Sequence, residues 1–519
     1  MTDNVNNSSK ISDAQKNLMM RREEISQESR KINREESLMK KRKEKILTKE
    51  ISFDKSLSDV ASSEIDFIEL TKKLKSDDVQ ERLKSTIKIR QLLSLQKDPP
   101  INEVIEAGLI PIFIEFLTNK EESQLQFEAA WILTNVASGS SRQTQTIVDA
   151  GGISLFINLL KSPISNIKEQ SIWALGNITG DSPQNRDLVL ESGILEPLIF
   201  ELNFPNRLSF TRNAVWTLSN LCRGKPGPKL SYLKIIVTAL EKFIFLEDTG
   251  ILADACWAFS YISEGSHERI QLVIESGIIL RITELLMHRE TIVQTPALRV
   301  IGNIATGDDL QTQIIINCGA LPCLLTLLSS YYKSIKKESC WTISNVTAGN
   351  PEQIQAVIDA NIIPTLIYIL KNSEMELKKE AAWAISNATS GGIAKQIDYL
   401  VKKDCLKPMI ELLSSSDPRV IRVILDGLEN ILEIGNKKSR KQGLNVYAQS
   451  IEQEGGLEKI ENLQHHPNND IYEHSIRLLE KFFGAEEEYS EISENNIDNK
   501  NAFKGCQQIP DCSFGFVKK

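Results

Sequence analysis

Tryptophan recurs along this 519-residue chain at a nearly constant spacing. The six tryptophans are separated by 42, 43, 41, 84 and 42 residues, and they stand at Trp131, Trp173, Trp216, Trp257, Trp341 and Trp383. The doubled interval skips one position, which Arg299 occupies. A fixed period of this length indicates an array of structural repeats, each packed only on its neighbours. Such an array explains a chain that is longer than a single hydrophobic core usually grows.

A second series of residues repeats with the same period. Its members are separated by 43, 42, 84, 42 and 42 residues, and they are Gly108, Gly151, Gly193, Gly277, Gly319 and Asn361. Glycine and asparagine tolerate the positive φ angle that often ends a helix. We therefore expect each member of this series to separate two helices of its repeat.

The pattern within one unit is helical. Between residues 362 and 391, Leu366, Ile369 and Leu370 form an apolar stripe, polar residues interrupt it, and a second helical pattern follows. A unit of about 42 residues with two longer helices and one short helix is typical of armadillo and HEAT repeats. We expect an all-α, right-handed superhelical solenoid of about ten armadillo repeats across residues 67–485.

Asparagine follows most of these tryptophans by four residues, at Asn135, Asn177, Asn220, Asn345 and Asn387. Residues four apart lie on one face of a helix. A single pair of this kind is usually core packing with a helix cap, but five copies in one register favour another explanation. Apolar neighbours already supply a core, and buried amides would each need a partner. We therefore expect both residue types to line a concave groove.

The chemistry of this Trp–Asn ladder suits an extended, basic peptide. An asparagine amide both donates and accepts hydrogen bonds, so it can hold a peptide backbone. Indole faces pack the stems of lysine and arginine and add a cation–π attraction of ~0.5–2 kcal/mol. Asp181 and Glu380 are in register with the ladder and could select for basic side chains. Tyr261 and Arg299 interrupt the ladder, which divides it into two sites.

Composition narrows the classes of function. The chain holds 61 Lys+Arg and 69 Asp+Glu, a net charge of −8, which argues against a general binder of nucleic acid or anionic membranes. No apolar run approaches the ~20 residues of a membrane helix, and no Cys/His cluster has zinc spacing. Phosphate-loop, GxSxG and HExxH motifs are missing. We expect an intracellular protein that is not an enzyme and uses no cofactor.

Seven segments closely resemble successive repeats of the importin-α (karyopherin-α) family, the armadillo adaptors that read nuclear localisation signals. They are FEAAWILTNVASGS, QSIWALGNITGDS, AVWTLSNLCRGK, ACWAFSYISEG, ALRVIGNIATGDD, ESCWTISNVTAGN and KEAAWAISNATSGG. The resemblance covers nearly the whole chain and includes the interruptions at Tyr261 and Arg299.

The resemblance implies two sites for the lysine- and arginine-rich signals of cargo proteins. The major site would consist of Trp131, Asn135, Gly139, Thr144, Gln170, Trp173, Asn177, Asp181, Trp216, Asn220 and Arg223. The minor site would consist of Tyr261, Arg299, Trp341, Asn345, Glu380, Trp383 and Asn387. Asp181 would take the key lysine of the signal.

The amino-terminal segment acquires a meaning from the same resemblance. Residues 16–45 hold 11 Lys/Arg and 6 Asp/Glu, and an apolar residue recurs every seven positions. Composition alone is typical of a coiled coil, a membrane-surface helix or a solvated tail, whereas the resemblance implies that residues 1–50 bind importin-β. The run Arg21–Glu24 is less basic than the arginine run usual in the family.

This segment also contains a basic cluster of its own, formed by Lys40, Lys41, Arg42 and Lys43. A flexible linker, residues 51–66, would tether the cluster to the groove. A tethered ligand competes at an effective concentration that can reach millimolar. We therefore expect the cluster to occupy the groove until importin-β takes the segment.

The carboxyl end, LQHHPNNDIYEHSIRLLEKFF, resembles the last repeat of the family, which contacts the export receptor that recycles the adaptor. The alternative is a polar cap that ends the solenoid. Residues 486–519 are expected to form an acidic, disordered tail. The resemblance implies shuttling between cytoplasm and nucleus through the nuclear pore, as a monomer or a heterodimer with importin-β, without nucleic acid or membrane insertion. Two other classes of function are possible alternatives to the import adaptor. One is an enzyme, and the other is a scaffold of the β-catenin type, in which the groove tends to be basic.

Overall fold

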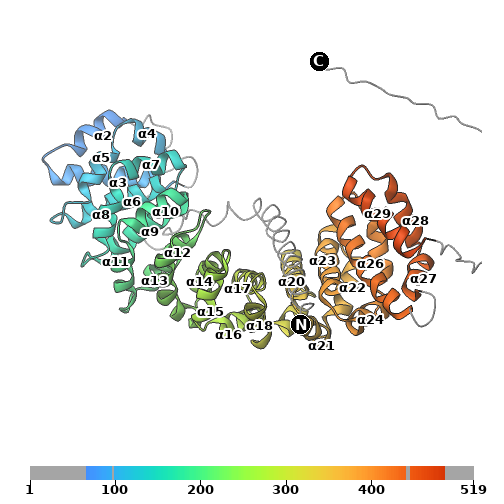
Figure 1. Cartoon of the computed structure of the whole chain (residues 1–519). Helices are drawn as coiled ribbons and strands as arrows, with labels where there is room; N and C mark the ends of the chain where they lie inside the picture. The colour runs from blue at the N-terminus through green and yellow to red at the C-terminus, as the bar shows by residue number, and fades with distance from the viewer. Residues whose placement is uncertain (1–65, 96–98, 440–444, 485–519) are drawn as a thin grey trace, which may run out of the picture.

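The computed structural model describes residues 66–95, 99–439 and 445–484. The predicted importin-β-binding segment 1–50, the linker 51–66 except for its last residue, and the tail 486–519 lie outside these ranges. Within them all regular secondary structure is helical. The helices form a curved array in which each repeat packs on the next (Figure 1). The predicted all-α armadillo solenoid is confirmed.

Ten long helices, one from each repeat, stack side by side along the concave side of the array (Figure 1). They are α3 (Val79–Leu93), α6 (Ser123–Ala137), α9 (Ser165–Asp181), α12 (Leu208–Cys222), α14 (Thr249–Ser263), α17 (Thr291–Ile304), α20 (Lys333–Thr347), α23 (Met375–Gly391), α26 (Pro418–Ser439) and α29 (Asn469–Phe482). We call them the third helices. Every tryptophan of the chain lies on one of them.

Two shorter helices precede the third helix in most repeats. The first helices are α4 (Ile101–Glu106), α7 (Ser141–Asp149), α10 (Pro183–Glu191), α15 (His267–Glu275), α18 (Asp309–Asn317), α21 (Pro351–Asp359), α24 (Ala394–Lys402) and α27 (Val446–Gln453). The second helices are α2 (Phe67–Leu74), α5 (Ile110–Phe116), α8 (Gly152–Leu159), α11 (Leu195–Leu202), α16 (Ile279–Leu285), α19 (Ala320–Leu327), α22 (Ile362–Asn372), α25 (Leu406–Glu411) and α28 (Gly456–Asn462). Short 3₁₀ turns, η3 (Leu412–Ser414) and η4 (Leu463–His465), extend the last two.

The turn between the first and second helix has a positive φ in eight repeats, and the second sequence series predicts six of these turns. The φ angles run from 55° at Asn361 to 84° at Gly193. Asp404 adopts the same conformation, with φ of 64°, at a position where the sequence series offers no glycine. A residue with a Cβ atom is sterically strained at positive φ. Glycine avoids this strain, and Asn and Asp partly offset it with local hydrogen bonds.

The core is continuous along the array because each third helix is covered on both sides by its neighbours. On α9, for example, Ile172, Leu175 and Ile178 are completely buried. Burial of one such side chain stabilises the fold by about 1.5–3 kcal/mol. An unbroken core of this kind is what holds repeats that could not fold alone.

Glutamines tie successive first helices together. Gln353 closes the capping box of α21, and its Nε2 donates to the carbonyl of Asp309 on α18, at 2.8 Å. Gln396 makes the same bond to Pro351, at 2.8 Å. Gln311 reaches His267 in this way, at 3.1 Å. The third position of a first helix is therefore a point at which one repeat grips the preceding one.

The fifth repeat has no separate first helix. After α12, residues 223–229 form a loop, and a single helix, α13 (Leu230–Leu240), continues into the 3₁₀ helix η2 (Glu241–Phe245) before α14. The helix α13 contacts both α11 and α15, so it fills the place that a bent pair of helices occupies elsewhere. The sequence RGKPGPK, which interrupts the glycine series, builds this loop.

Candidate functional site

The third helices bring the predicted residues together in two groups. The major-site residues lie on α6 (Trp131, Asn135), α7 (Thr144), α9 (Gln170, Trp173, Asn177, Asp181) and α12 (Trp216, Asn220). Gly139 lies between α6 and α7, and Arg223 directly follows α12. The minor-site residues lie on α14 (Tyr261), α17 (Arg299), α20 (Trp341, Asn345) and α23 (Glu380, Trp383, Asn387). The basic cluster Lys40–Lys43 lies outside the described residues.

Two of the ladder tryptophans are more deeply buried than the rest. Trp216 is 1% exposed and Trp341 is 9% exposed, whereas Trp131, Trp173 and Trp383 are partly exposed. A glycine lies against each buried indole. A Cβ atom at Gly176 would lie 2.2 Å from Cζ3 of Trp216, and one at Gly302 would lie 2.2 Å from Cζ3 of Trp341. Each glycine therefore makes the space in which the next indole is seated.

The asparagines of the ladder are buried, and this corrects the sequence-based expectation that burial would leave their amides without partners. Asn135, Asn177, Asn220, Asn345 and Asn387 are between 0% and 6% exposed. The expectation was wrong because each amide has a partner in the preceding repeat. Nδ2 of Asn220 donates to the carbonyl of Gly176 at 2.9 Å, and Nδ2 of Asn387 donates to that of Ser344 at 2.9 Å.

Nδ2 of Asn135 donates instead to the hydroxyl of Ser94, at 3.2 Å. The bond to a backbone carbonyl recurs at the other four ladder asparagines and turns their amides the same way. It joins Asn177 to Thr134 at 3.2 Å and Asn345 to Gly302 at 3.4 Å. These bonds use the amide NH₂ group and leave the amide oxygen as an acceptor. For Asn220, Asn345 and Asn387, no donor within residues 66–95, 99–439 and 445–484 reaches that oxygen.

Asn303 makes the same bond between repeats but belongs to neither predicted site. It therefore allows the structural role of the bond to be tested apart from peptide binding. Its Nδ2 donates to the carbonyl of Ser260 at 2.8 Å, and the side chain is 3% exposed. We expect Asn303→Ala to lower the free energy of unfolding by about 1–3 kcal/mol, because it removes a buried side chain and the hydrogen bonds that its amide donates to Ser260 and Ser263. Chemical denaturation measures the loss. Peptide binding should stay unchanged, and a loss of binding equal to that of Asn177→Ala would contradict this division.

An arginine packs on the first tryptophan of each site. The Arg90 guanidinium lies 4.5 Å from the centroid of Trp131, and its Nε donates to Glu128 at 2.8 Å. In the second site Arg299 lies 5.6 Å from the centroid of Trp341, and its Nε is 2.6 Å from a carboxylate oxygen of Glu338.

Sequence reasoning identified Arg299 but missed Arg90. The signal was present, because Arg90 stands 41 residues before Trp131, where the period places the next ladder position. Glu128 and Glu338 stand three residues before their tryptophans, in the register of Glu380. Arg90 forms an ion pair with Glu128, and Arg299 forms one with Glu338. In the repeat before Glu380 the ladder position that these arginines occupy is taken by Trp341.

The remaining major-site residues have identifiable structural surroundings. Asp181 ends α9 and accepts a hydrogen bond from Nδ2 of Asn185, at 3.0 Å. A carboxylate beside the carbonyl end of a helix makes a negative site that suits an ammonium group. Thr144 is buried and its hydroxyl donates to the carbonyl of Ala137 at 3.1 Å. Gln170 is buried, and Gly139 leaves the room that the amide of Gln143 needs to cap α7.

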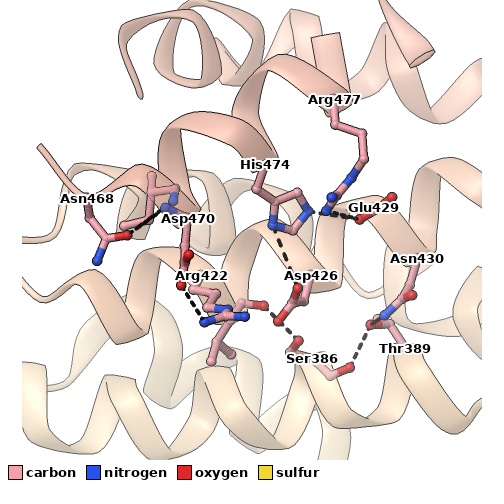
Figure 2. A network of polar contacts seen from close by, with 12 residues as sticks. Ser386, Thr389, Arg422, Asp426, Glu429, Asn430, Asn468, Asp470, His474 and Arg477 are labelled. Atoms are coloured by element: carbon pink, nitrogen blue, oxygen red, sulfur yellow. Dashed lines mark hydrogen bonds and ion pairs between the residues drawn. The ribbon is translucent and has the colours of Figure 1, made fainter. Parts of the chain in front are cut away.

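A polar network holds the last repeat against the ninth (Figure 2). His474 on α29 lies 2.8 Å from a carboxylate oxygen of Glu429 and 3.8 Å from one of Asp426, both on α26. Arg477 approaches Glu429 at 3.6 Å. One turn away, Arg422 pairs with Asp470 at 3.1 Å. This network explains the conspicuous polar residues of the carboxyl end as docking contacts.

The hydrogen bond from His474 lowers the pKa of Glu429 to about 2, aided by the charges of His474, Arg477 and Lys481 and opposed by burial. A carboxyl group with a lowered pKa contributes stability above its unfolded pKa near 4.5, and the contribution is lost as the pH falls towards 2. We expect Glu429→Gln to destabilise the docking of α29 by about 1–2 kcal/mol at pH 7, allowing for solvent screening. The difference from the unmodified protein should shrink below pH ~4.5 and disappear only as the pH falls through about 2.

Amide hydrogen exchange in α29 measures this local stability at each pH. Glu433→Gln is the matched control, because Glu433 lies one turn further along α26 and pairs with Lys481 near the surface. A pH-independent difference for Glu429→Gln would contradict the assignment.

Neither a metal site nor a straight membrane-spanning helix is found in the described part of the chain. No group of three or more His, Cys, Asp or Glu residues is arranged to hold a metal ion there. No single helix is long and apolar enough to cross a bilayer, and two bent helix pairs, α18 with α19 and α21 with α22, satisfy that test by length and composition alone.

Sequence profiles of known repeats match most of the chain. The Armadillo/beta-catenin-like repeat matches residues 97–138, 140–180, 182–223, 266–306, 308–348, 350–390 and 394–433, and the Atypical Arm repeat matches residues 445–499. The gap between residues 223 and 266 corresponds to the fifth repeat, which lacks a separate first helix.

Similar proteins cover the chain almost from end to end. Importin subunit alpha-2 of Arabidopsis thaliana is 52% identical over 482 residues, which is 90% of this chain and 89% of the relative. Importin subunit alpha-1b of Oryza sativa subsp. japonica is 50% identical, over 85% of this chain and 84% of the relative. Importin subunit alpha-B of Dictyostelium discoideum is 50% identical, over 90% and 91%.

The crystal structure of an engineered protein superimposes with a TM-score of 0.73 at 27% identity, over 81% of this chain and all of the other. The chain shares the solenoid fold, matches the repeat profiles, and is about 50% identical in sequence to these relatives over most of its length. The chain belongs to the importin alpha family of armadillo-repeat proteins.

Proposed function

We propose that this protein is a nuclear import adaptor whose concave face binds lysine- and arginine-rich nuclear localisation signals and links the cargo to importin-β. The observation that carries the proposal is the repeated asparagine arrangement. Four of the five amides, those of Asn177, Asn220, Asn345 and Asn387, are turned the same way by a bond to a carbonyl of the preceding repeat, at intervals set by the stacking of third helices. Family membership supports an adaptor rather than an enzyme.

The spacing suits an extended peptide. Packed helices lie about 8–10 Å apart and an extended chain advances ~3.3 Å per residue, so about three ligand residues match one repeat. An amide oxygen at each repeat would accept from a backbone N–H of such a ligand. The partly exposed indoles of Trp131, Trp173 and Trp383 would hold the stems of basic side chains.

Two separate sites follow from the interruption of the ladder. On α14 and α17, Tyr261 replaces asparagine and Arg299 replaces tryptophan. Tyr261 stacks on Trp257 with the ring centroids 5.9 Å apart. We propose a major site across α6, α9 and α12 with Asp181 as its lysine-binding carboxylate, and a minor site across α20 and α23 with Glu380. A signal with two basic clusters would use both.

The proposal extends to the segments on either side of the array. Residues 1–50 would bind importin-β, and Lys40, Lys41, Arg42 and Lys43 would compete with cargo for the major site. The last repeat would contact the export receptor, which would let the adaptor shuttle between cytoplasm and nucleus through the nuclear pore.

Fluorescence anisotropy with a labelled peptide that contains a Lys-Lys-Arg-Lys cluster tests the proposal. We expect micromolar or tighter binding to the chain that lacks residues 1–62, no binding of the same peptide with alanine in place of the basic residues, and weaker binding to the full-length chain. Adding importin-β should restore binding to the full-length chain. Equal affinities with and without residues 1–62 would refute autoinhibition, and no binding to either form would refute the adaptor function.

A further inference from the structure

The loop at the start of the fifth repeat, residues 223–229, is gripped from both sides by arginines of other repeats. It follows α12 directly and begins with Arg223, the last residue of the major site. The loop has no first helix of its own to support it. Two guanidinium groups supply that support, one from the fourth repeat and one from the sixth.

Arg186 on α10 holds the first residue of the loop. The residue is 0% exposed, and its Nη1 donates to the carbonyl of Arg223 at 2.6 Å. Its Nε donates to Asp187 at 2.9 Å, which fixes the plane of the guanidinium. The N–H of Arg223 in turn donates to the carbonyl of Asn220 at 3.2 Å. Three residues are thereby linked in series, and the last of them is the final asparagine of the major site.

Arg269 on α15 holds the other end of the loop. Its Nη2 donates to the carbonyl of Pro228 at 2.6 Å. Arg269 stands at the third position of its first helix, where Gln311, Gln353 and Gln396 grip the preceding repeat in α18, α21 and α24. The longer arginine side chain reaches a carbonyl that belongs to a loop instead of a helix.

The surroundings of Arg269 are shaped for it. A Cβ atom at Gly227 would lie 2.1 Å from its Nη1, and one at Gly265 would lie 2.6 Å from its Cδ. The sequence RGKPGPK therefore has a glycine where the guanidinium passes. Burial, together with the nearby charge of Arg186, lowers the pKa of Arg269.

Placing the cation of Arg269 near that of Arg186 does not favour stability by itself, because like charges repel. Desolvating a charge is costly unless it is well paired, and apolar residues of similar volume are often at least as stabilising. The arginines supply directional hydrogen bonds to both ends of the 223–229 loop. Apolar side chains could not make such bonds.

We propose that Arg186 and Arg269 are positioning residues of the major site, which hold the 223–229 loop so that Arg223 meets the bound basic peptide in a fixed orientation. This inference rests on the proposed function, because the ligand is the same peptide. It assigns no direct contact with the ligand to either arginine. Their effect on binding passes through Arg223.

The test is a double-mutant cycle in the chain that lacks residues 1–62, read by anisotropy with the Lys-Lys-Arg-Lys peptide. We expect Arg186→Gln and Arg269→Gln each to weaken binding about five- to tenfold, the loss of one well-placed polar contact. In an Arg223→Ala background the same changes should have less than a twofold effect, because the group that they position is gone. Equal losses in both backgrounds, or unchanged affinity in all variants, would overturn the proposal.

Arg269→Gln guards against misfolding, since glutamine is the residue at this helix position in four other repeats. Lys229→Gln is the matched control in the same loop, because Lys229 is exposed and forms a surface pair with Glu191 at 3.2 Å, and it should bind like the unmodified chain. Amide hydrogen exchange at residues 223–230 gives a readout without ligand and should quicken in both arginine variants. If it quickens while the unmodified chain binds no peptide, the proposed function fails and the clamp on the loop stands. Unchanged exchange refutes the clamp.

Discussion

Replacing Trp173 and Asn177 together by alanine should weaken the binding of a lysine-rich peptide at least tenfold, or about 1.4 kcal/mol. Both residues lie on α9, the middle of the three helices of the major site. Trp173 is partly exposed, so its removal takes away an indole face worth ~0.5–2 kcal/mol to a cation, together with apolar contact. Removal of Asn177 takes away an amide that the bond to Thr134 holds in one orientation.

Anisotropy on the chain lacking residues 1–62 measures this loss, and Asp181→Lys provides an independent arm. Reversing that charge should weaken binding by at least the same factor, and more strongly at low salt, because exposed charges are screened by ions. Trp257→Ala is the matched control. Trp257 has the same helix register, but it lies on α14, outside the major site, where it stacks on Tyr261. A loss in Trp257→Ala as large as in the double variant would show that these tryptophans act through the stability of the array.

The 42-residue period was enough to predict the repeats, because it reflects contacts that each unit makes with the next. It placed every ladder residue on a third helix, and it predicted the positive φ at positions such as Gly151 and Asn361. Such features are local. A helix face and a left-handed turn are both set by residues a few positions apart, so a single sequence displays them.

Contacts between repeats could not be predicted in the same way. The amide of Asn220 donates to the carbonyl of Gly176, 44 residues earlier. The sequence around either residue does not identify this bond. The argument that buried amides would lack partners therefore failed. The period includes the position of Arg90, but the contacts of this residue could not be predicted, for a related reason. Its role depends on lying over Trp131 and beside Glu128, two residues of the next repeat.

The second large effect is expected at the two ladder glycines. An alanine in place of a glycine within a helix usually stabilises the fold by roughly 0.5–1 kcal/mol. At Gly176 and Gly302 the sign should reverse. The added Cβ would lie 2.2 Å from the indole of Trp216 or Trp341, closer than van der Waals contact allows, and 2.6 Å or 2.8 Å from a threonine hydroxyl. Overpacking of this kind costs about 1–3 kcal/mol.

Each substitution should also weaken one site only, since the displaced indole belongs to one site. Gly176→Ala should lower peptide affinity at the major site, and Gly302→Ala should lower it at the minor site, measured in a Trp173→Ala background. Gly250→Ala on α14 is the control for the helix itself, because the nearest atom to its Cβ is 3.3 Å away, in the carboxylate of Asp248. It should leave stability unchanged or raise it. If Gly176→Ala behaved like Gly250→Ala, the indole of Trp216 would have room to move, and its orientation would not depend on the glycine beneath it.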